Sequence, residues 1–316
     1  MRKILLAILL ILLVALQVQA RISRLPNQKP IHGSQVDWTH PLARDLKSCY
    51  LANEFSGSAI YNLIDNRKGN FINGVWTTKW SKNGVYLRDN GAGVNNDIID
   101  FGSGHSSKGS DWTVLIVAQT DVSPPGENTL WTQKPAVNQS STVLIRHDLS
   151  DGKWWIQVGD TGGHNWHNYT SFGLTTGVPF TIGFSMKWAE NTMQAFYNGE
   201  VAPCVIGGVG FRDAGTYPDM EFLGASYGGW VNYYGWTGPV RAYFKWKRAL
   251  TAKEMRQVYE DPYCFIKKPQ NMALRWFGIP AAAPPAGGGG VPTQIIGPIV
   301  TQWISDEVYA GSLAYA

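Results

Sequence analysis

The most regular hydrophobic pattern in the chain runs from residue 237 to residue 264. In its first half Val240, Ala242, Phe244 and Trp246 alternate with polar residues. A period of two with one apolar face predicts a half-buried strand. Most of the chain upstream looks like further strands, which need this late strand to complete their sheet.

The second half of this stretch changes to a helical period. Thr251 followed by Glu254 three residues later has the spacing of a capping box. Asp261-Pro262 ends the pattern, because the residue before a proline avoids helical backbone angles. We therefore predict one short helix over residues 251–260.

Short segments with strand-like composition recur along the rest of the chain, separated by turn signals such as Asp151-Gly152 and Asn198-Gly199. We predict strands at 47–52, 59–64, 84–89, 97–102, 111–120, 128–133, 141–148, 153–158, 179–188, 191–199 and 219–225. About a dozen antiparallel strands with one late helix predict an all-β fold, either a sandwich or a barrel.

Composition narrows the class of function. The 316 residues include 14 Trp, 14 Tyr and 12 Phe, and such aromatic content suits strands and flat binding surfaces. The net charge is only +4, with no basic run interleaved with aromatic residues, so nucleic acid is not an expected partner.

The two ends of the chain differ in composition from its middle. Residues 1–20 have a basic start, an apolar run and a small-residue end, which predict a cleaved signal peptide rather than a membrane anchor. We expect an N-terminal arm at 21–36, one domain at 37–268, a Pro/Gly-rich linker at 269–290 and a tail at 291–316. This organisation predicts a secreted or extracellular protein, with periplasmic or virion-associated locations as alternatives and no membrane span after cleavage.

Three cysteines follow the signal peptide, namely Cys49, Cys204 and Cys264. Export would permit a disulfide, and a bridge from Cys49 to Cys264 would join the two ends of the domain. The odd count leaves at least one thiol outside any intrachain pair. Three buried reduced cysteines are an equally good interpretation.

Three patches together resemble the laminin G-type (LamG-like) jelly roll of the concanavalin A-like lectin/glucanase superfamily, as found in phage and bacterial surface proteins. They are GVYLRDNGAGVNNDIIDFG (84–102), PFTIGFSMKWAENTMQAFYNGEVA (179–202) and WTGPVRAYFKWKRALTAKEMRQVYEDPYCF (236–265). The opening DWTHPLARDLKSCYLANE (37–54) is similar to the start of such modules. The resemblance covers roughly residues 37–268 and implies a sandwich of two antiparallel sheets with one short C-terminal helix.

Part of this family binds calcium, so the resemblance allows a calcium site, for which Asn95, Asp97 and Asp100 are the candidate ligands. Each of the three is also an ordinary turn residue. The closing strand begins Gly238-Pro239-Val240-Arg241 and lacks the acidic residue that many members carry there. No metal or other cofactor is otherwise expected.

Catalysis is not indicated by the sequence. Glycosidases of this fold need paired carboxylates at alternate strand positions, such as E-x-D-x-x-E, and no such run occurs. Asp219 and Glu221 are the nearest pair, and we expect them on a solvated face. We therefore predict a protein that is not an enzyme, with a glycoside hydrolase as the least favoured option.

Two glycine-rich loops carry the candidate ligand-binding residues. The loop at 159–171 contains an H-x-x-H pattern, which is weak evidence for a metal, and the loop at 224–238 is dense in aromatic residues. Aromatic rings stack on sugar faces while amides bind hydroxyl groups. The candidates are Tyr227, Trp230, Asn232, Tyr233, Tyr234 and Trp236, joined by His164, Trp166 and Tyr169. The alternative is that these rings seal the end of the sandwich core.

The adjacent pair Trp154 and Trp155 predicts one buried ring and one exposed ring, because neighbouring strand residues face opposite sides. We predict a lectin-like module that binds a glycan or surface polysaccharide. The alternative is a structural or adhesive protein of a cell surface or virion that contacts other chains through its N-terminal arm or C-terminal tail.

Overall fold

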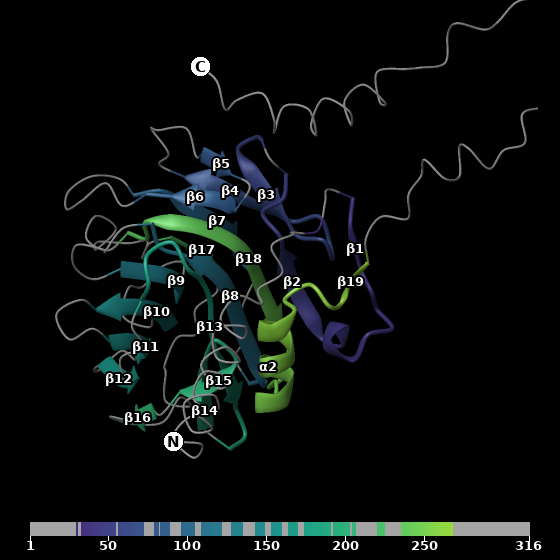
Figure 1. The fold of residues 1–316 in the computed structure, drawn as a ribbon. Helices are drawn as coiled ribbons and strands as arrows, with labels where there is room; N and C mark the ends of the chain where they lie inside the picture. The colour runs from purple at the N-terminus through teal and green to yellow at the C-terminus, as the bar shows by residue number, and fades with distance from the viewer. Residues whose placement is uncertain are drawn as a thin grey trace, which may run out of the picture. The chain divides into compact units, whose positions relative to one another are not determined.

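The computed structural model describes sixteen stretches of the chain, all within the compact unit 1–270. They are residues 30, 33–54, 56–72, 79–81, 83–88, 96–104, 109–121, 128–134, 143–148, 153–159, 164–169, 174–190, 192–202, 204–206, 220–224 and 235–267. Two antiparallel sheets form stacked layers, and helix α2 (Ala252–Glu260) lies outside them (Figure 1). This confirms the predicted all-β jelly-roll sandwich with one short C-terminal helix.

One layer is a nine-stranded sheet in which every pairing is antiparallel. Its order is β16 (Cys204–Ile206), β12 (His164–Tyr169), β11 (Lys153–Gly159), β10 (Val143–Asp148), β9 (Asn128–Lys134), β17 (Met220–Leu223), β7 (Ile98–Gly102), β4 (Lys68–Ile72) and β3 (Ala59–Tyr61). Since neighbouring strands alternate in direction, β17, β10 and β12 finish at the end of the sheet where β7, β9 and β11 begin.

The other layer is an eight-stranded antiparallel sheet. Its order is β15 (Glu200–Ala202), β14 (Thr192–Tyr197), β13 (Pro179–Lys187), β8 (Trp112–Gln119), β18 (Gly238–Trp246), β6 (Gly84–Leu87) and β5 (Lys79–Ser81), with β2 (Leu46–Tyr50) also paired to β18. A short ribbon joins β1 (Gln35–Val36) to β19 (Ile266–Lys267), and one 3-10 turn, η1, spans Pro41–Ala43.

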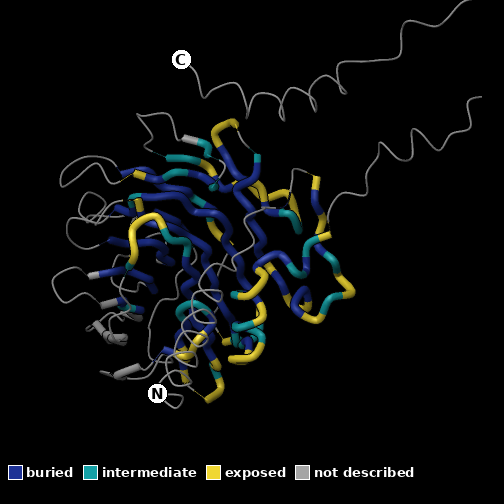
Figure 2. Tube along the Cα trace, viewed as in Figure 1, coloured by how far each residue is buried: buried dark blue, intermediate teal, exposed yellow. Residues whose placement is uncertain are grey.

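Strand β18 is the centre of the eight-stranded sheet. It pairs with β8 along one side, and on the other side with β6 at its start and β2 at its end. All nine of its residues are buried, so the prediction of a half-buried strand is wrong. The reason is that both faces of this strand are covered, one by the nine-stranded sheet and the other by a second apolar layer (Figure 2).

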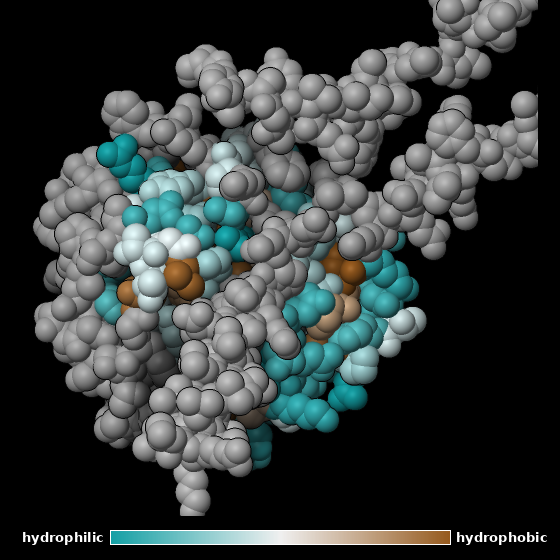
Figure 3. All heavy atoms as spheres, viewed as in Figure 1, coloured by the Kyte–Doolittle hydropathy of each residue, from teal (hydrophilic) through white to brown (hydrophobic). Residues whose placement is uncertain are grey.

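The second apolar layer explains how the late helix is held. Met255 and Val258 of α2 pack in one cluster with Phe244 and Trp246 of β18 and Leu115 of β8. The remaining helix surface is hydrophilic where it faces solvent (Figure 3). An amphipathic helix of nine residues is therefore fixed to the sheet by its apolar stripe.

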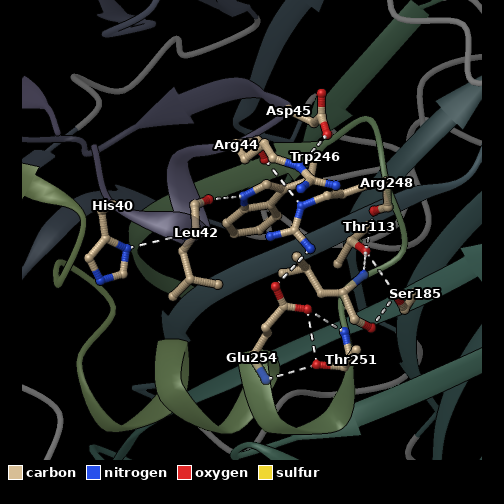
Figure 4. Close-up of polar contacts among 11 residues, drawn as sticks. His40, Leu42, Arg44, Asp45, Thr113, Ser185, Trp246, Arg248, Thr251 and Glu254 are labelled. Atoms are coloured by element: carbon tan, nitrogen blue, oxygen red, sulfur yellow. Dashed lines mark hydrogen bonds and ion pairs between the residues drawn. The ribbon is translucent and has the colours of Figure 1, made fainter. Parts of the chain in front are cut away.

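The predicted capping box is present at the start of this helix (Figure 4). The backbone N–H of Glu254 donates to Thr251 Oγ1 at 3.3 Å, and the Thr251 N–H donates to Glu254 Oε2 at 2.8 Å. Arg248 adds an ion pair to Glu254 at 2.8 Å. Trp246 donates its indole N–H to the Leu42 carbonyl at 2.6 Å, which ties the strand before the helix to the N-terminal segment.

Cys49 and Cys264 are both reduced. Cys49 is buried in β2 and Cys264 is half-buried after α2, and both are free thiols. Burial raises the pKa of Cys264 to about 12 and that of Cys49 further still. Within the described residues, the bridge considered between the two ends of the domain is thus not formed.

Candidate functional site

The first candidate segment is a strand rather than the predicted loop. Residues 164–169 form β12, which pairs with β11 on one side and β16 on the other. In the backbone register Trp166 lies opposite Gln157, and His167 lies opposite Ile156. Its polar composition did not predict a strand, which pairs with the preceding strand β11 and with β16 further along the chain.

This strand separates the two histidines of the H-x-x-H pattern. Positions three apart in a strand belong to opposite faces of the sheet, so the backbone places His164 and His167 on opposite faces. The strand directions also place Tyr169 at the end of the sheet where β17 finishes, and His164 at the other end. The contact roles of Trp166 and Tyr169 remain predictions.

Trp236 is the described member of the second candidate segment, and its predicted role as a surface ring is wrong. It is 0% exposed. Its ring packs 6.2 Å from that of Trp154 and 5.8 Å from that of Phe180, between centroids. The sandwich end needs large rings to close the space between its sheets, so this tryptophan is part of the core. The other candidates, Tyr227, Trp230, Asn232, Tyr233 and Tyr234, lie outside the described residues.

Gly224 and Trp236, at the two ends of this segment, are joined by a backbone hydrogen bond. The Trp236 N–H donates to the Gly224 carbonyl at 2.6 Å, and the Gly224 N–H donates to the Leu130 carbonyl at 2.9 Å. Gly224 has φ +98°, and a Cβ there would lie 2.6 Å from the Asp97 carbonyl oxygen. Only glycine fits this approach. The two ends of the aromatic segment are therefore fixed on the sandwich.

The calcium candidates are not brought together among the described residues. Asp97 is buried, and its Oδ2 accepts from the Arg88 N–H at 3.1 Å while its Oδ1 has no partner. Asp100 is half-buried, and its Oδ1 accepts from the Gly102 N–H at 2.7 Å. Asp97 immediately precedes β7 and Asp100 lies within it, three positions further along the chain. Asn95 lies outside the described residues.

Burial has a measurable electrostatic consequence at Asp97. Desolvation raises the pKa of this carboxyl group to about 6, against the smaller opposing effect of the Arg88 N–H. In the part of the chain that the structure describes, no group of three or more His, Cys, Asp or Glu side chains could hold a metal ion.

Trp155 is a partly exposed aromatic residue on the outer face of the nine-stranded sheet, which we define as the face turned away from the core. Trp154 is 1% exposed and packs in the core, whereas Trp155 is half-buried, so the prediction for this pair is confirmed. Arg146 on the neighbouring strand holds its guanidinium 5.0 Å from the centroid of the Trp155 ring. The register pairs Arg146 with Trp155 and with Thr129.

This outer-face pair was not among the candidate binding residues from sequence. Strand alternation predicts that one ring of the Trp154–Trp155 pair is exposed. Only the register between β10 and β11 places Arg146 beside Trp155. On the next strand, β12, the register sets Asn168 opposite Trp155, so the position of the predicted candidate Trp166 shares that face and the position of Tyr169 is on the other face. Trp155 is also two residues from the start of β11, at the sheet end where Gly224 and Trp236 meet.

Glu221 is inside the sandwich, and the prediction of a solvated face for it is wrong. It is 0% exposed, and its Oε1 accepts from Tyr243 Oη at 2.5 Å, Lys245 Nζ at 3.2 Å and Trp131 Nε1 at 3.2 Å. Burial, followed by the Glu221 charge, raises the pKa of Tyr243 well above its usual value. A register shift between Glu221 and Phe222 accompanies this inward orientation. Asp219 lies outside the described residues.

No family model matches the chain, and no curated protein matches it. Among solved structures, the chain is similar to a mutant of Trypanosoma rangeli sialidase displaying trans-sialidase activity, with a TM-score of 0.48 and 15% identity over 69% of this chain and 33% of that one. It is also similar to the Ruminococcus gnavus IT-sialidase CBM40 bound to alpha2,3 sialyllactose, with a TM-score of 0.42 and 14% identity over 55% of this chain and 96% of that one.

A third similar structure is the NanB sialidase from Streptococcus pneumoniae, with a TM-score of 0.41 and 16% identity over 54% of this chain. The chain spans 26% of that sialidase. Among the described residues, no helix is long and apolar enough to cross a membrane.

Proposed function

We propose that this protein is a non-catalytic, lectin-like carbohydrate-binding module whose contact surface is the outer face of the nine-stranded sheet around Trp155. The observation that supports this most directly is a partly exposed indole ring lying beside a guanidinium on a rigid sheet. A flat ring of this kind can stack on the apolar face of a sugar, and its amphipathic neighbours can bind hydroxyl groups.

Rigidity favours this site over an isolated surface aromatic. Arg146 is 9% exposed and lies on β10, one strand away from Trp155 on β11, so two paired backbones hold the two side chains. A ring already held in place loses less conformational freedom on binding. Five residues stay predicted contributors, because Gly224 and Trp236, between which they lie in the sequence, meet at the sheet end where β11 begins. They are Tyr227, Trp230, Asn232, Tyr233 and Tyr234.

A non-catalytic role agrees with the position of the interior acid. A glycosidase carboxyl group must reach the scissile bond together with a second carboxyl group. Glu221 instead points into the core, where Tyr243 and Lys245 bind it. We propose further that the domain is of the laminin G type, is exported after cleavage of residues 1–20, and meets other chains through its arm or tail.

A glycan array with the purified protein tests the binding role directly, in calcium and in chelator. We expect reproducible binding that Trp155→Ala weakens by at least about tenfold, or about 1.4 kcal/mol. The melting temperature should change little, because this ring is half-buried. Trp38→Ala is the matched control, since Trp38 is 58% exposed near the separate β1–β19 ribbon and should leave binding unchanged.

Two results would contradict the proposal. Binding that survives Trp155→Ala would place the contact surface elsewhere on the molecule. No binding to any glycan, combined with a stable oligomer in solution, would favour the structural or adhesive alternative.

A further inference from the structure

A buried acid–amine pair connects the two sheets of the sandwich. Glu221 on β17 belongs to the nine-stranded sheet, and Lys245 on β18 belongs to the eight-stranded sheet. Lys245 Nζ lies 3.2 Å from Glu221 Oε1, and the side chains are 7% and 0% exposed. Neither residue is needed for the proposed glycan contact.

The surroundings of this pair are aromatic and closed to solvent. Lys245 Nζ lies 5.3 Å from the centroid of the Trp112 ring, and Trp112, Trp131 and Tyr243 are each at most 1% exposed. Removing an ammonium and a carboxylate from water is costly, and their mutual attraction often fails to offset the cost. Transfer of one proton from the ammonium to the carboxylate would remove both charges from these surroundings and give the amine and carboxylic acid, which are the forms that can react with each other.

Two further donors act on the same carboxyl group. Tyr243 Oη donates to Glu221 Oε1 at 2.5 Å, and Trp131 Nε1 donates to that oxygen at 3.2 Å. Preorganised donors on one oxygen stabilise the negative charge that develops there when a nucleophile adds to the carbon. The amine nitrogen lies 3.2 Å from Oε1 of the same carboxyl group, so it is held beside the carbon that it must attack.

We propose that Glu221 and Lys245 form an intramolecular amide (isopeptide) bond. Lys245 Nζ adds to the Glu221 carboxyl carbon, the bond from that carbon to Oε2 breaks, and Oε2 leaves as water with two protons, one from the carboxylic acid and one from the amine. Oε1 remains as the amide carbonyl, still bonded to Tyr243 and Trp131. The reaction is a condensation, so it needs no oxidant, reductant or activating group.

The bond would join the two layers covalently and close a loop from residue 221 to residue 245. That loop contains the aromatic segment that begins at Gly224 and returns at Trp236. A cross-link of this kind stabilises chiefly by limiting the conformations of the unfolded chain. It would also hold both ends of the segment when the domain is stretched or partly unfolded.

Mass spectrometry of the full, reduced protein tests the bond. We expect the wild-type mass to lie one water molecule, about 18 Da, below the mass calculated for the measured chain from its determined N-terminus. Proteolysis under denaturing conditions should yield one branched peptide joining the Glu221 and Lys245 fragments. Lys245→Met should restore the full calculated mass, and Tyr243→Phe should lower the cross-linked fraction at a fixed time after refolding.

The wild-type peptide map decides the question even if a variant fails to fold. Folded wild-type protein with its full calculated mass and separate Glu221 and Lys245 peptides would overturn the proposal and leave an ordinary ion pair. A loss of about 18 Da that persists in Lys245→Met would also overturn it, because the water would then come from another site.

Discussion

Replacing Asp97 with asparagine should make the protein more stable at neutral pH, and the gain should depend on pH. Burial raises the pKa of this carboxyl group from 3.8 to about 6. The folded state therefore binds the proton more tightly than the unfolded state does. The stability that this group contributes is fully present below about pH 3.8 and is lost as pH rises through about 6.

The magnitude follows from the pKa difference. The pKa of Asp97 rises by about two units, and each unit is worth about 1.36 kcal/mol. The contribution of this group to the unfolding free energy therefore differs by about 3 kcal/mol between acidic and neutral solution. Asparagine has nearly the same shape and can still accept the Arg88 N–H, but it carries no charge to bury. The unfolding free energy of Asp97→Asn minus that of wild type should therefore increase by up to about 3 kcal/mol from pH 4 to pH 8.

Urea unfolding of both proteins across this pH range measures the effect. Thr251→Ala is a control, because the lost cap hydrogen bond does not titrate between pH 5 and pH 8, so its deficit should stay constant there. A difference between Asp97→Asn and wild type that is equal at both ends of the range would refute the reasoning. It would mean that the carboxyl group is as well solvated in the folded protein as in the unfolded chain.

Three other predictions concern stability and processing. Thr251→Ala should lower the unfolding free energy by about 0.5–2 kcal/mol through loss of the N-cap, and a negligible change in urea unfolding would contradict the capping argument. Trp236→Ala should cost about 3–5 kcal/mol in the same assay, because the ring is fully buried against Trp154 and Phe180, and a cost under about 1 kcal/mol would place it outside the core. N-terminal sequencing of exported protein should begin at Arg21, whereas an intact Met1 would identify residues 1–20 as an anchor.

Local features of the fold were predictable because their causes are local. The capping box needs only Thr251 and Glu254 three residues apart, and it forms as the spacing predicts. The alternation in 179–188 predicted β13, and the adjacent pair Trp154 and Trp155 predicted one buried and one exposed ring. In each case the backbone period alone decides which residues share a face.

The prediction for the binding site was less successful because exposure and strand pairing depend on which other segments pack against or pair with a residue, and the local pattern does not specify those segments. Trp236 looks like a surface ring among glycines and other aromatic residues, yet it is core because Trp154 and Phe180 meet it at the sandwich end. The segment 164–169 looks like a polar loop, yet β11 and β16 supply the hydrogen bonds that make it a strand. Arg146 joins Trp155 only through the register of β10 and β11.

The sequence by itself determined the all-β class, the late strand and its capped helix, because backbone periodicity and capping act over a few residues. Only the tertiary structure decided that β18 is buried on both faces and that Glu221 points inward to Tyr243 and Lys245. The alternating sequence pattern of a strand does not show whether its second face meets water or is covered by another layer. The difference comes from which distant elements pack on that face, and neither period nor composition carries this information.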